Sequence, residues 1–215
     1  MVGWFRRKRD VTPTIDSLRF DTTAWNYLGE RQPNQMRLWE TPDHDAVMLH
    51  FFGIPPDLPQ VRTVEELSSF YGEGLKRSAA KVVECDFSRV ADCPAIRLLI
   101  KVPQKPHGMM YQGAFTLPFR EFSFVIKIQC SEVGTTGVRE AVLLEQRMKA
   151  GETPNVSGAG PMFPDWNPDA PEHDKLFPAH PITRLRRLLE HITRTATMDP
   201  QVRSLPGFPL PAPAA

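Results

Sequence analysis

Histidine and carboxylate residues that could bind a metal gather in one proline-rich stretch near the C-terminus. His173 and Asp174 are adjacent, His180 follows six residues later, and Asp165 and Asp169 precede them. Imidazoles and carboxylates are ordinary ligands of divalent cations, but these spacings match no recognised ligand motif. A proline-rich loop also holds its side chains poorly in place for an ion. We therefore expect no metal site and no bound cofactor.

The candidate nucleophiles are three cysteines, Cys85, Cys93 and Cys130. A reactive thiol needs a neighbouring base and surroundings that lower its pKa. Cys85 and Cys93 have acidic neighbours in the sequence, which raise a thiol pKa, and Cys130 falls on the apolar face of a predicted strand. The chain also lacks the local motifs of hydrolases, zinc proteases and nucleotide-binding enzymes. We predict no catalytic residues.

Two further features could bind a ligand or stabilise the fold. Gly134-Thr-Thr-Gly137 precedes a predicted helix, where free backbone N–H groups could cradle an anion. We expect instead that the hydroxyls of Thr135 and Thr136 cap that helix. His44 and His50 flank a predicted hairpin, and His50 lies in an apolar strand. We expect His50 to be a core histidine whose hydrogen bonds are satisfied.

Length and composition indicate one folded domain with appendages. The chain has 215 residues, of which 41% are hydrophobic and 24% charged, so it can bury a core. No apolar run approaches the roughly 18–20 residues that cross a bilayer. Residues 6–9 hold four of the 26 cations, so the remainder carries a net charge of −3. This charge argues against a nucleic-acid-binding protein.

The N-terminal segment 1–19 is basic, and we expect it to be flexible. Trp4 and Phe5 stand beside the four cations and could contact an anionic membrane or an acidic partner, although a solvated terminus is the simpler reading. No apolar stretch follows the cations, so the segment is not a secretion signal. An odd number of widely spaced cysteines fits a reducing compartment, and we expect a cytoplasmic protein.

Residues 20–150 are predicted to form an α+β domain. Alternation is clearest from Phe122 to Cys130, where every second residue is apolar and the intervening ones are mostly polar, as in an antiparallel sheet with one buried face. We expect helices over one face of the sheet or both, and the helix 138–149 to turn Val138 and Met148 towards the core. About six strands are predicted, at 36–40, 46–52, 81–90, 95–102, 109–119 and 122–130, with helices at 64–79 and 138–149.

A proline-rich extension follows residue 150. Ten prolines occur in the first 150 residues and twelve in the last 65. We expect a proline-rich linker over 151–181, part of which lies along the body because its aromatic residues are costly to leave in water. An amphipathic helix over 182–198 is predicted to pack on the body, with Pro181 in or near its first turn. The tail 199–215 is proline-rich, and its part 205–213 favours an extended polyproline II form, either loose or read by a partner.

The weak candidates for partner binding lie in this extension. A stripe of Arg184, Arg187, His191 and Arg194 follows the polar face of the predicted helix. It could be a solvated face, or it could dock a partner. Trp166 in the linker is the other candidate, because an aromatic side chain often anchors an interface.

The order of the predicted elements resembles the PsbP-like fold, which includes Ran-GTPase-binding relatives and bacterial secretion-effector chaperones. The resemblance covers about residues 20–150. It rests on the hairpin Met36–Phe52, the break Pro55-Pro-Asp-Leu-Pro59, the helix after Thr63, and strands that end at Glu132 before the Gly134–Gly137 turn. It implies a binding or assembly protein without a catalytic site, and it transfers no functional residue.

The sequence therefore predicts a non-catalytic adaptor or chaperone-like assembly factor that binds another protein. The alternative is a small-ligand enzyme or receptor with a pocket between sheet and helices. A pocket lined by two or more convergent titratable groups would favour this alternative.

Overall fold

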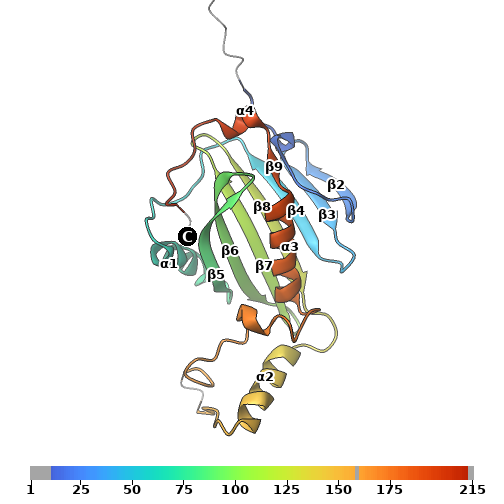
Figure 1. Ribbon diagram of the computed structural model, residues 1–215, viewed down its shortest axis with the longest axis vertical. Helices are drawn as coiled ribbons and strands as arrows, with labels where there is room; N and C mark the ends of the chain where they lie inside the picture. Colours follow the sequence, from blue (N-terminus) through green and yellow to red (C-terminus); the bar gives the residue numbers. More distant parts are fainter. Residues whose placement is uncertain (1–10, 158–159, 213–215) are drawn as a thin grey trace, which may run out of the picture.

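A computed structural model describes residues 11–157 and 160–212. Its centre is an antiparallel sheet of seven strands in the order β2-β3-β4-β8-β7-β6-β5 (Figure 1). The α+β fold with a mostly antiparallel sheet is thus confirmed, with one strand more than expected. The basic residues 6–9, with Trp4 and Phe5, lie outside the described residues. The strands are β2 (Asn26–Gln32), β3 (Met36–Glu40), β4 (Ala46–Phe52), β5 (Lys81–Val90), β6 (Cys93–Pro103), β7 (Met109–Pro118) and β8 (Ser123–Ser131).

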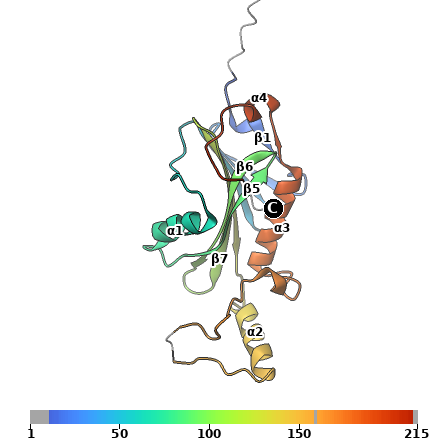
Figure 2. The same ribbon diagram turned by 60° about the vertical axis from the view of Figure 1, so that its left-hand side comes forward.

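Helices cover the two faces of the sheet unequally. α3 (Pro181–Thr195) lies along one face across β7 and β8, and α1 (Val64–Leu75) packs against β5 from the opposite face (Figures 1 and 2). α2 (Val138–Lys149) extends beyond one end of the sheet. Among the described residues, no helix is long and apolar enough to span a membrane.

The main core lies between α3 and the sheet. Ile182, Leu185, Leu189 and Ile192 are buried at helical spacing, which confirms that the predicted amphipathic helix packs on the body. The close approach of α3 to the sheet requires a small residue in the strand beneath the helix. A Cβ atom added at Gly113 in β7 would lie 2.8 Å from Leu185 Cδ1. Pro181 occupies the first turn of the helix, where its missing N–H removes no intrahelical bond.

The buried face of β8 is the one that the sequence predicts. Phe124, Ile126, Ile128 and Cys130 are fully buried, and the residues between Phe124 and Cys130 are half-buried. The expected turn at Ala91-Asp92 joins β5 and β6, and both residues have positive φ. Such φ values are typical of two-residue hairpin turns that match the twist of the strands.

The edge strand β2 is the strand that the sequence analysis missed. Its sequence, NYLGERQ, shows no apolar alternation, and six of its seven residues are exposed. It pairs with β3 through an irregular register around Gly29. An edge strand exposed on both faces needs no buried stripe, so its sequence carries no apolar alternation.

Residues 11–19, the described part of the segment 1–19 that was expected to be flexible, join the main core, and so do residues 198–205 after α3. Residues 1–10 lie outside the described residues. Ile15 and Leu18 are buried, and β1 (Leu18–Arg19) pairs with β9 (Thr197–Met198) directly after α3. The short helix α4 (Pro200–Arg203) buries Val202. These few apolar residues are buried by contacts with residues distant in sequence. The composition of residues 11–19 alone therefore wrongly predicts a flexible chain.

The predicted facing of α2 is also wrong. Val138 and Met148 are 43% and 52% exposed, whereas Arg139 and Leu143 are the buried residues of the helix. The helix lies past the end of the sheet and packs against the segment that follows it. That segment contributes Phe163 and Ala170, both buried, and the 3-10 turn η2 (Pro171–His173). Part of the predicted linker 151–181 is therefore ordered against the body.

Candidate functional site

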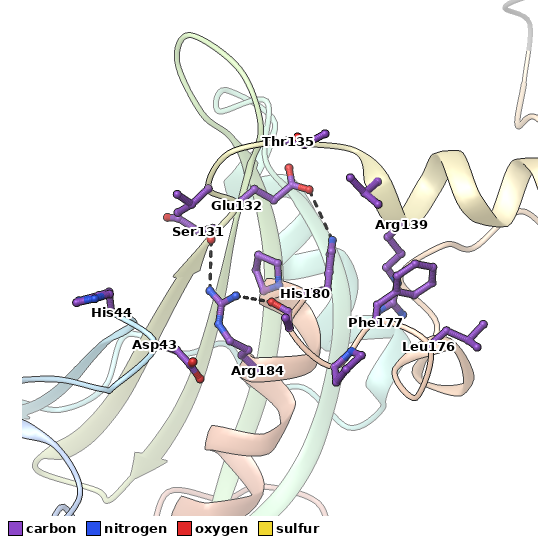
Figure 3. Close-up of a pocket in the computed structure, with 15 residues that line it drawn as sticks. Asp43, His44, Ser131, Glu132, Thr135, Arg139, Leu176, Phe177, His180 and Arg184 are labelled. Carbon is purple, nitrogen blue, oxygen red and sulfur yellow. Dashed lines mark hydrogen bonds and ion pairs between the residues drawn. The ribbon is translucent and has the colours of Figure 1, made fainter.

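An open groove of about 550 Å³ lies where the sheet ends and α2 begins (Figure 3). One wall is the connection from β8 to α2, and the other is the segment that enters α3. Its rim carries exposed apolar side chains, and its floor carries buried polar ones. The residues that line the groove include Val133, Val138, Leu176, Glu132, His180 and Arg184.

The connection between β8 and α2 is held by a carboxylate. Glu132 accepts hydrogen bonds from the backbone N–H groups of Met109 (2.8 Å) and Gly137 (3.1 Å). Gly137 is the N-cap of α2 and has a left-handed conformation, which glycine adopts without strain. The expected capping of α2 by Thr135 and Thr136 is therefore wrong. The Gly134–Gly137 turn does receive an anionic group, and the group is the chain's own Glu132.

His180 sits at the start of α3 and points its ring at Glu132 (Figure 3). Its Nδ1 atom accepts a long hydrogen bond of 3.4 Å from the N–H of Ile182, as an N-cap residue does. Its Nε2 atom is 3.6 Å from Glu132 Oε1, beyond hydrogen-bond length. Burial, reinforced by the charge of Arg139, lowers the pKa of His180 to about 4, so the imidazole is neutral at neutral pH.

Glu140, in the first turn of α2, completes a cluster with Glu132 and His180. One ligand atom from each of the three side chains lies within 4.8 Å of the others. Burial raises the pKa of Glu140, and the negative charges of Asp169 and Glu132 act in the same direction. Within the described part of the chain, Glu140 Oε2 and His180 Nε2 are buried and have no hydrogen-bond partner.

Arg139, next to Glu140, is a fully buried cation whose charge is satisfied internally. Its guanidinium donates to Asp174 Oδ1 at 3.0 Å and to the carbonyl of Ala170 at 2.8 Å. Asp174 also accepts two bonds from Arg186 of α3. A buried arginine requires such partners, because an unpaired charge in the interior is costly.

A second charged group joins the same segment to the sheet. Asp169 is buried and accepts hydrogen bonds from Lys101 of β6 and from the hydroxyl of Tyr111 of β7. Burial raises the pKa of Tyr111, and the charge of Asp169 adds to this effect. The phenol therefore stays protonated, and its O–H group donates the hydrogen bond to Asp169. These contacts fix residues 168–174, which are part of the predicted linker 151–181.

The predicted basic stripe of α3 divides into buried and exposed members. Arg184 forms two hydrogen bonds with Asp45 and has a side chain only 14% exposed, and His191 Nε2 is 2.8 Å from the carbonyl of Asp21. Both side chains already bond within the chain, and their role in partner binding stays a prediction. Arg187 and Arg194 are exposed.

Trp166, the remaining partner-binding candidate, is half-buried and packs on Phe163, with ring centroids 5.5 Å apart. It lies outside the groove, near Arg147 of α2, in a separate depression of the surface. Its contact with Phe163 gives it a role in ordering the segment after α2.

Among the described residues, the metal candidates from the sequence do not form one cluster. Asp174 and Asp169 accept bonds from cations, as described above, and Asp165 accepts a bond from Arg147 at 2.7 Å. His180 instead meets Glu132 and Glu140, which the sequence analysis did not single out. Glu132 directly follows β8 and Glu140 lies in the first turn of α2, eight residues later, a spacing that signals no ligand pair by itself.

The three cysteines, His44 and His50 are not members of the cluster of Glu132, Glu140 and His180. Cys85, Cys93 and Cys130 are free thiols, and the predicted burial of Cys130 is confirmed. His44 is exposed at the edge of the groove. His50 stacks on Phe52, but its buried Nε2 atom lacks a hydrogen-bond partner in the described structure, so the expectation of a satisfied histidine is wrong.

Comparison with known proteins finds likeness in structure alone. No protein-family model and no curated protein sequence matches the chain. The Ran-binding protein Mog1p of Saccharomyces cerevisiae is similar in structure, with a TM-score of 0.47, 11% sequence identity, and coverage of 86% of this chain and 92% of that one. The cyanobacterial PsbP protein of Synechocystis sp. PCC 6803 has a TM-score of 0.39 and 11% identity over 66% of this chain and 87% of its own.

The resemblance to the PsbP-like fold expected from the sequence is thus confirmed as a likeness of fold. At 11% identity it transfers no partner and no functional residue to this chain.

Proposed function

We propose that this chain is a non-catalytic protein-binding module, an adaptor or chaperone-like assembly factor, and that the groove at the end of the sheet receives its partner. The observation that carries the proposal is the apolar rim. Val133 is 88% exposed, Leu176 58% and Val138 43%, and all three line the same groove. Exposed apolar side chains gathered at one place favour an interaction site.

The position of these side chains favours a protein over a small molecule. A ligand confined to the floor would contact Glu132 and His180 and leave the rim in water. Covering Val133 and Leu176 requires a surface as wide as the groove. Fully burying an aliphatic side chain of this size stabilises a complex by roughly 1.5–3 kcal/mol, so the rim can supply a useful share of the binding energy.

The charges around the groove indicate what the partner presents. Arg184 is already neutralised by Asp45, and Arg139 by Asp174. An apolar side chain inserted between the rim residues therefore meets no unpaired cation on the floor. Arg187 is exposed and lies 3.9 Å from Asp43, which lines the groove. We propose that Arg187 speeds the approach of an acidic partner surface and contributes little to affinity.

We further propose a cytoplasmic location for this activity. The three cysteines are free thiols, which suits a reducing compartment. The near-neutral charge of the chain as a whole favours a protein partner over a nucleic acid.

A second candidate function, a small-ligand receptor or enzyme, is favoured by one observation. Glu132, Glu140 and His180 converge beside the groove, and such convergence of titratable groups is typical of ligand sites. A metabolite library tests this candidate by thermal shift. Stabilisation by one compound class that is lost in the Glu140→Gln variant would support it over protein binding.

Site-specific photo-crosslinking tests the main proposal. Val133 and Val156 are matched, since they are 88% and 90% exposed, and Val156 does not line the groove. Each is replaced in turn by p-benzoylphenylalanine and irradiated in cell extract. We expect one dominant adduct at position 133 that excess unlabelled protein competes away, and no such adduct at position 156. Equal labelling at both positions, or none that is competed, would overturn the proposal.

A further inference from the structure

We infer that Glu132, Glu140 and His180 form a binding site for one divalent transition-metal ion, of which Zn²⁺ is the best match. The three side chains come from the residue after β8, the first turn of α2 and the N-cap of α3. One ligand atom of each lies within 4.8 Å of the other two. The inference rests on this geometry and is independent of the groove's role in protein binding.

Two buried atoms of this cluster that lack a hydrogen-bond partner indicate a site for an ion. The side chains of His180 and Glu132 are each only 8% exposed. Within the described residues, His180 Nε2 and Glu140 Oε2 are buried without a hydrogen-bond partner, although buried polar atoms nearly always have one. A cation between them would satisfy both atoms at once. It would also offset the two nearby carboxylates.

Glu132 is held in position by its other contacts. Its two oxygens accept the N–H groups of Met109 and Gly137, which fix the carboxylate against the β8–α2 connection. Each carboxylate oxygen has more than one lone pair, so these bonds leave room for a metal. Hydrogen bonds of this kind orient metal ligands in known sites and strengthen them.

The donor set selects the metal. One imidazole nitrogen with two carboxylates suits Zn²⁺ and similar first-row ions, whereas Mg²⁺ prefers oxygen ligands in an octahedron with several waters. Zinc–ligand distances of about 2.0–2.2 Å separate neighbouring donor atoms by roughly 3–4 Å, so small side-chain rotations bring the three atoms to one ion. Glu132 and His180 line the groove, so water or a donor from a bound molecule can take the fourth position.

The hydrogen bond from the N–H of Ile182 to His180 Nδ1 opposes metal binding and limits the affinity of the site. Coordination through Nε2 requires the ring proton to move to Nδ1, and the 3.4 Å hydrogen bond from Ile182 is then lost. This bond is long and therefore weak. We expect reversible binding of Zn²⁺, weaker than in closed structural sites with four protein ligands.

Calorimetric titration of the full chain with Zn²⁺ alone tests the inference, with Mg²⁺ as the comparison ion. His180→Asn keeps an N-cap acceptor for α3 and removes Nε2. Glu140→Gln keeps the shape of the side chain and removes its charge. His173→Asn is the matched control, since His173 lies in the same segment and is not part of the cluster.

We expect one Zn²⁺ per chain, affinity reduced by about tenfold or more in His180→Asn and Glu140→Gln, and wild-type affinity in His173→Asn. Zn²⁺ should also raise the melting temperature of the wild type and of His173→Asn, and much less that of the two cluster variants. Circular dichroism of each variant without metal verifies folding. Absence of Zn²⁺ binding, or binding that His180→Asn leaves unchanged, would overturn the inference, as would equal affinity for Mg²⁺.

Discussion

Arg184 of α3 and Asp45, the residue before β4, form a two-bond ion pair across 139 positions of sequence. The Nε–Oδ2 and Nη2–Oδ1 distances are 2.9 and 2.8 Å, and Asp45 is 2% exposed. The Arg184 guanidinium also donates to the carbonyl of Ser131 at 3.3 Å. One side chain thus joins the C-terminal helix to two neighbouring strands at the edge of the groove.

Replacing Arg184 should destabilise the protein strongly. Arg184→Met leaves the charge of Asp45 buried and unpaired, and removing one partner of a buried pair costs about 3–5 kcal/mol. Urea unfolding measures the change. Arg187→Met is the matched control, because Arg187 lies on the same helix and its side chain is 57% exposed. A surface substitution there should change the free energy of unfolding by less than about 0.5 kcal/mol. Equal effects of the two variants would contradict the burial of the pair.

Gly113→Ala should destabilise the contact between α3 and the sheet. The added Cβ would lie 2.8 Å from Leu185 Cδ1 and 3.1 Å from Leu189 Cδ1, so the helix side chains must shift. Overpacking of this kind costs about 1–3 kcal/mol in the free energy of unfolding. Combining Gly113→Ala with Leu185→Ala should cost less than the sum of the two single changes, because the double variant removes the clash.

Gly74→Ala is the control for that experiment. Gly74 lies in α1, and a Cβ atom there meets nothing within 4 Å. Alanine is favoured over glycine in a helix by about 1 kcal/mol, so this variant should raise the melting temperature. Thermal unfolding of both variants separates steric contact from helix propensity. If Gly113→Ala stabilised the protein as Gly74→Ala does, the close approach of α3 to β7 would be wrong.

The cysteines should react slowly with thiol reagents near neutral pH. Burial, with the neighbouring charge of Asp86, raises the pKa of Cys85 to about 11, so only roughly a thousandth of it is thiolate at pH 8. Its alkylation rate should rise about tenfold per pH unit above pH 8 and level off near pH 11. Iodoacetamide labelling followed by mass spectrometry measures the rate, with an unfolded sample as the reference. Rapid labelling of Cys85 at pH 7, or of the buried Cys130 without denaturant, would contradict the structure.

Periodicity identifies those elements that bury one face. Phe124 to Cys130 alternates and forms β8 as predicted, and the spacing of Ile182, Leu185 and Leu189 predicts α3 and its buried stripe. The same signal fails for elements whose partners are not a broad apolar surface. The edge strand β2 buries no stripe, and α2 turns Arg139 inward because that residue meets Asp174 and the backbone of Ala170.

The candidate site depends on contacts that sequence spacing does not encode. Glu132, Glu140 and His180 are separated by eight and forty residues, and they meet because the segment after α2 returns to the end of the sheet. That return is fixed by polar contacts such as Tyr111 with Asp169, which join residues 58 positions apart. Composition marks the segment as proline-rich and acidic, and such segments are often linkers. Its aromatic residues predict packing from the sequence alone, and Phe163 is the one of them that is fully buried.

Binding of the partner identified at position 133 tests the central claim most directly. Isothermal titration compares the wild type with Val133→Asp and with Val156→Asp, which introduce the same charge at equally exposed valines. If the rim is the binding surface, Val133→Asp should weaken the affinity at least about tenfold, equivalent to about 1.4 kcal/mol, while Val156→Asp leaves it unchanged. Equal dissociation constants for the two variants would contradict the proposal that this groove binds a protein.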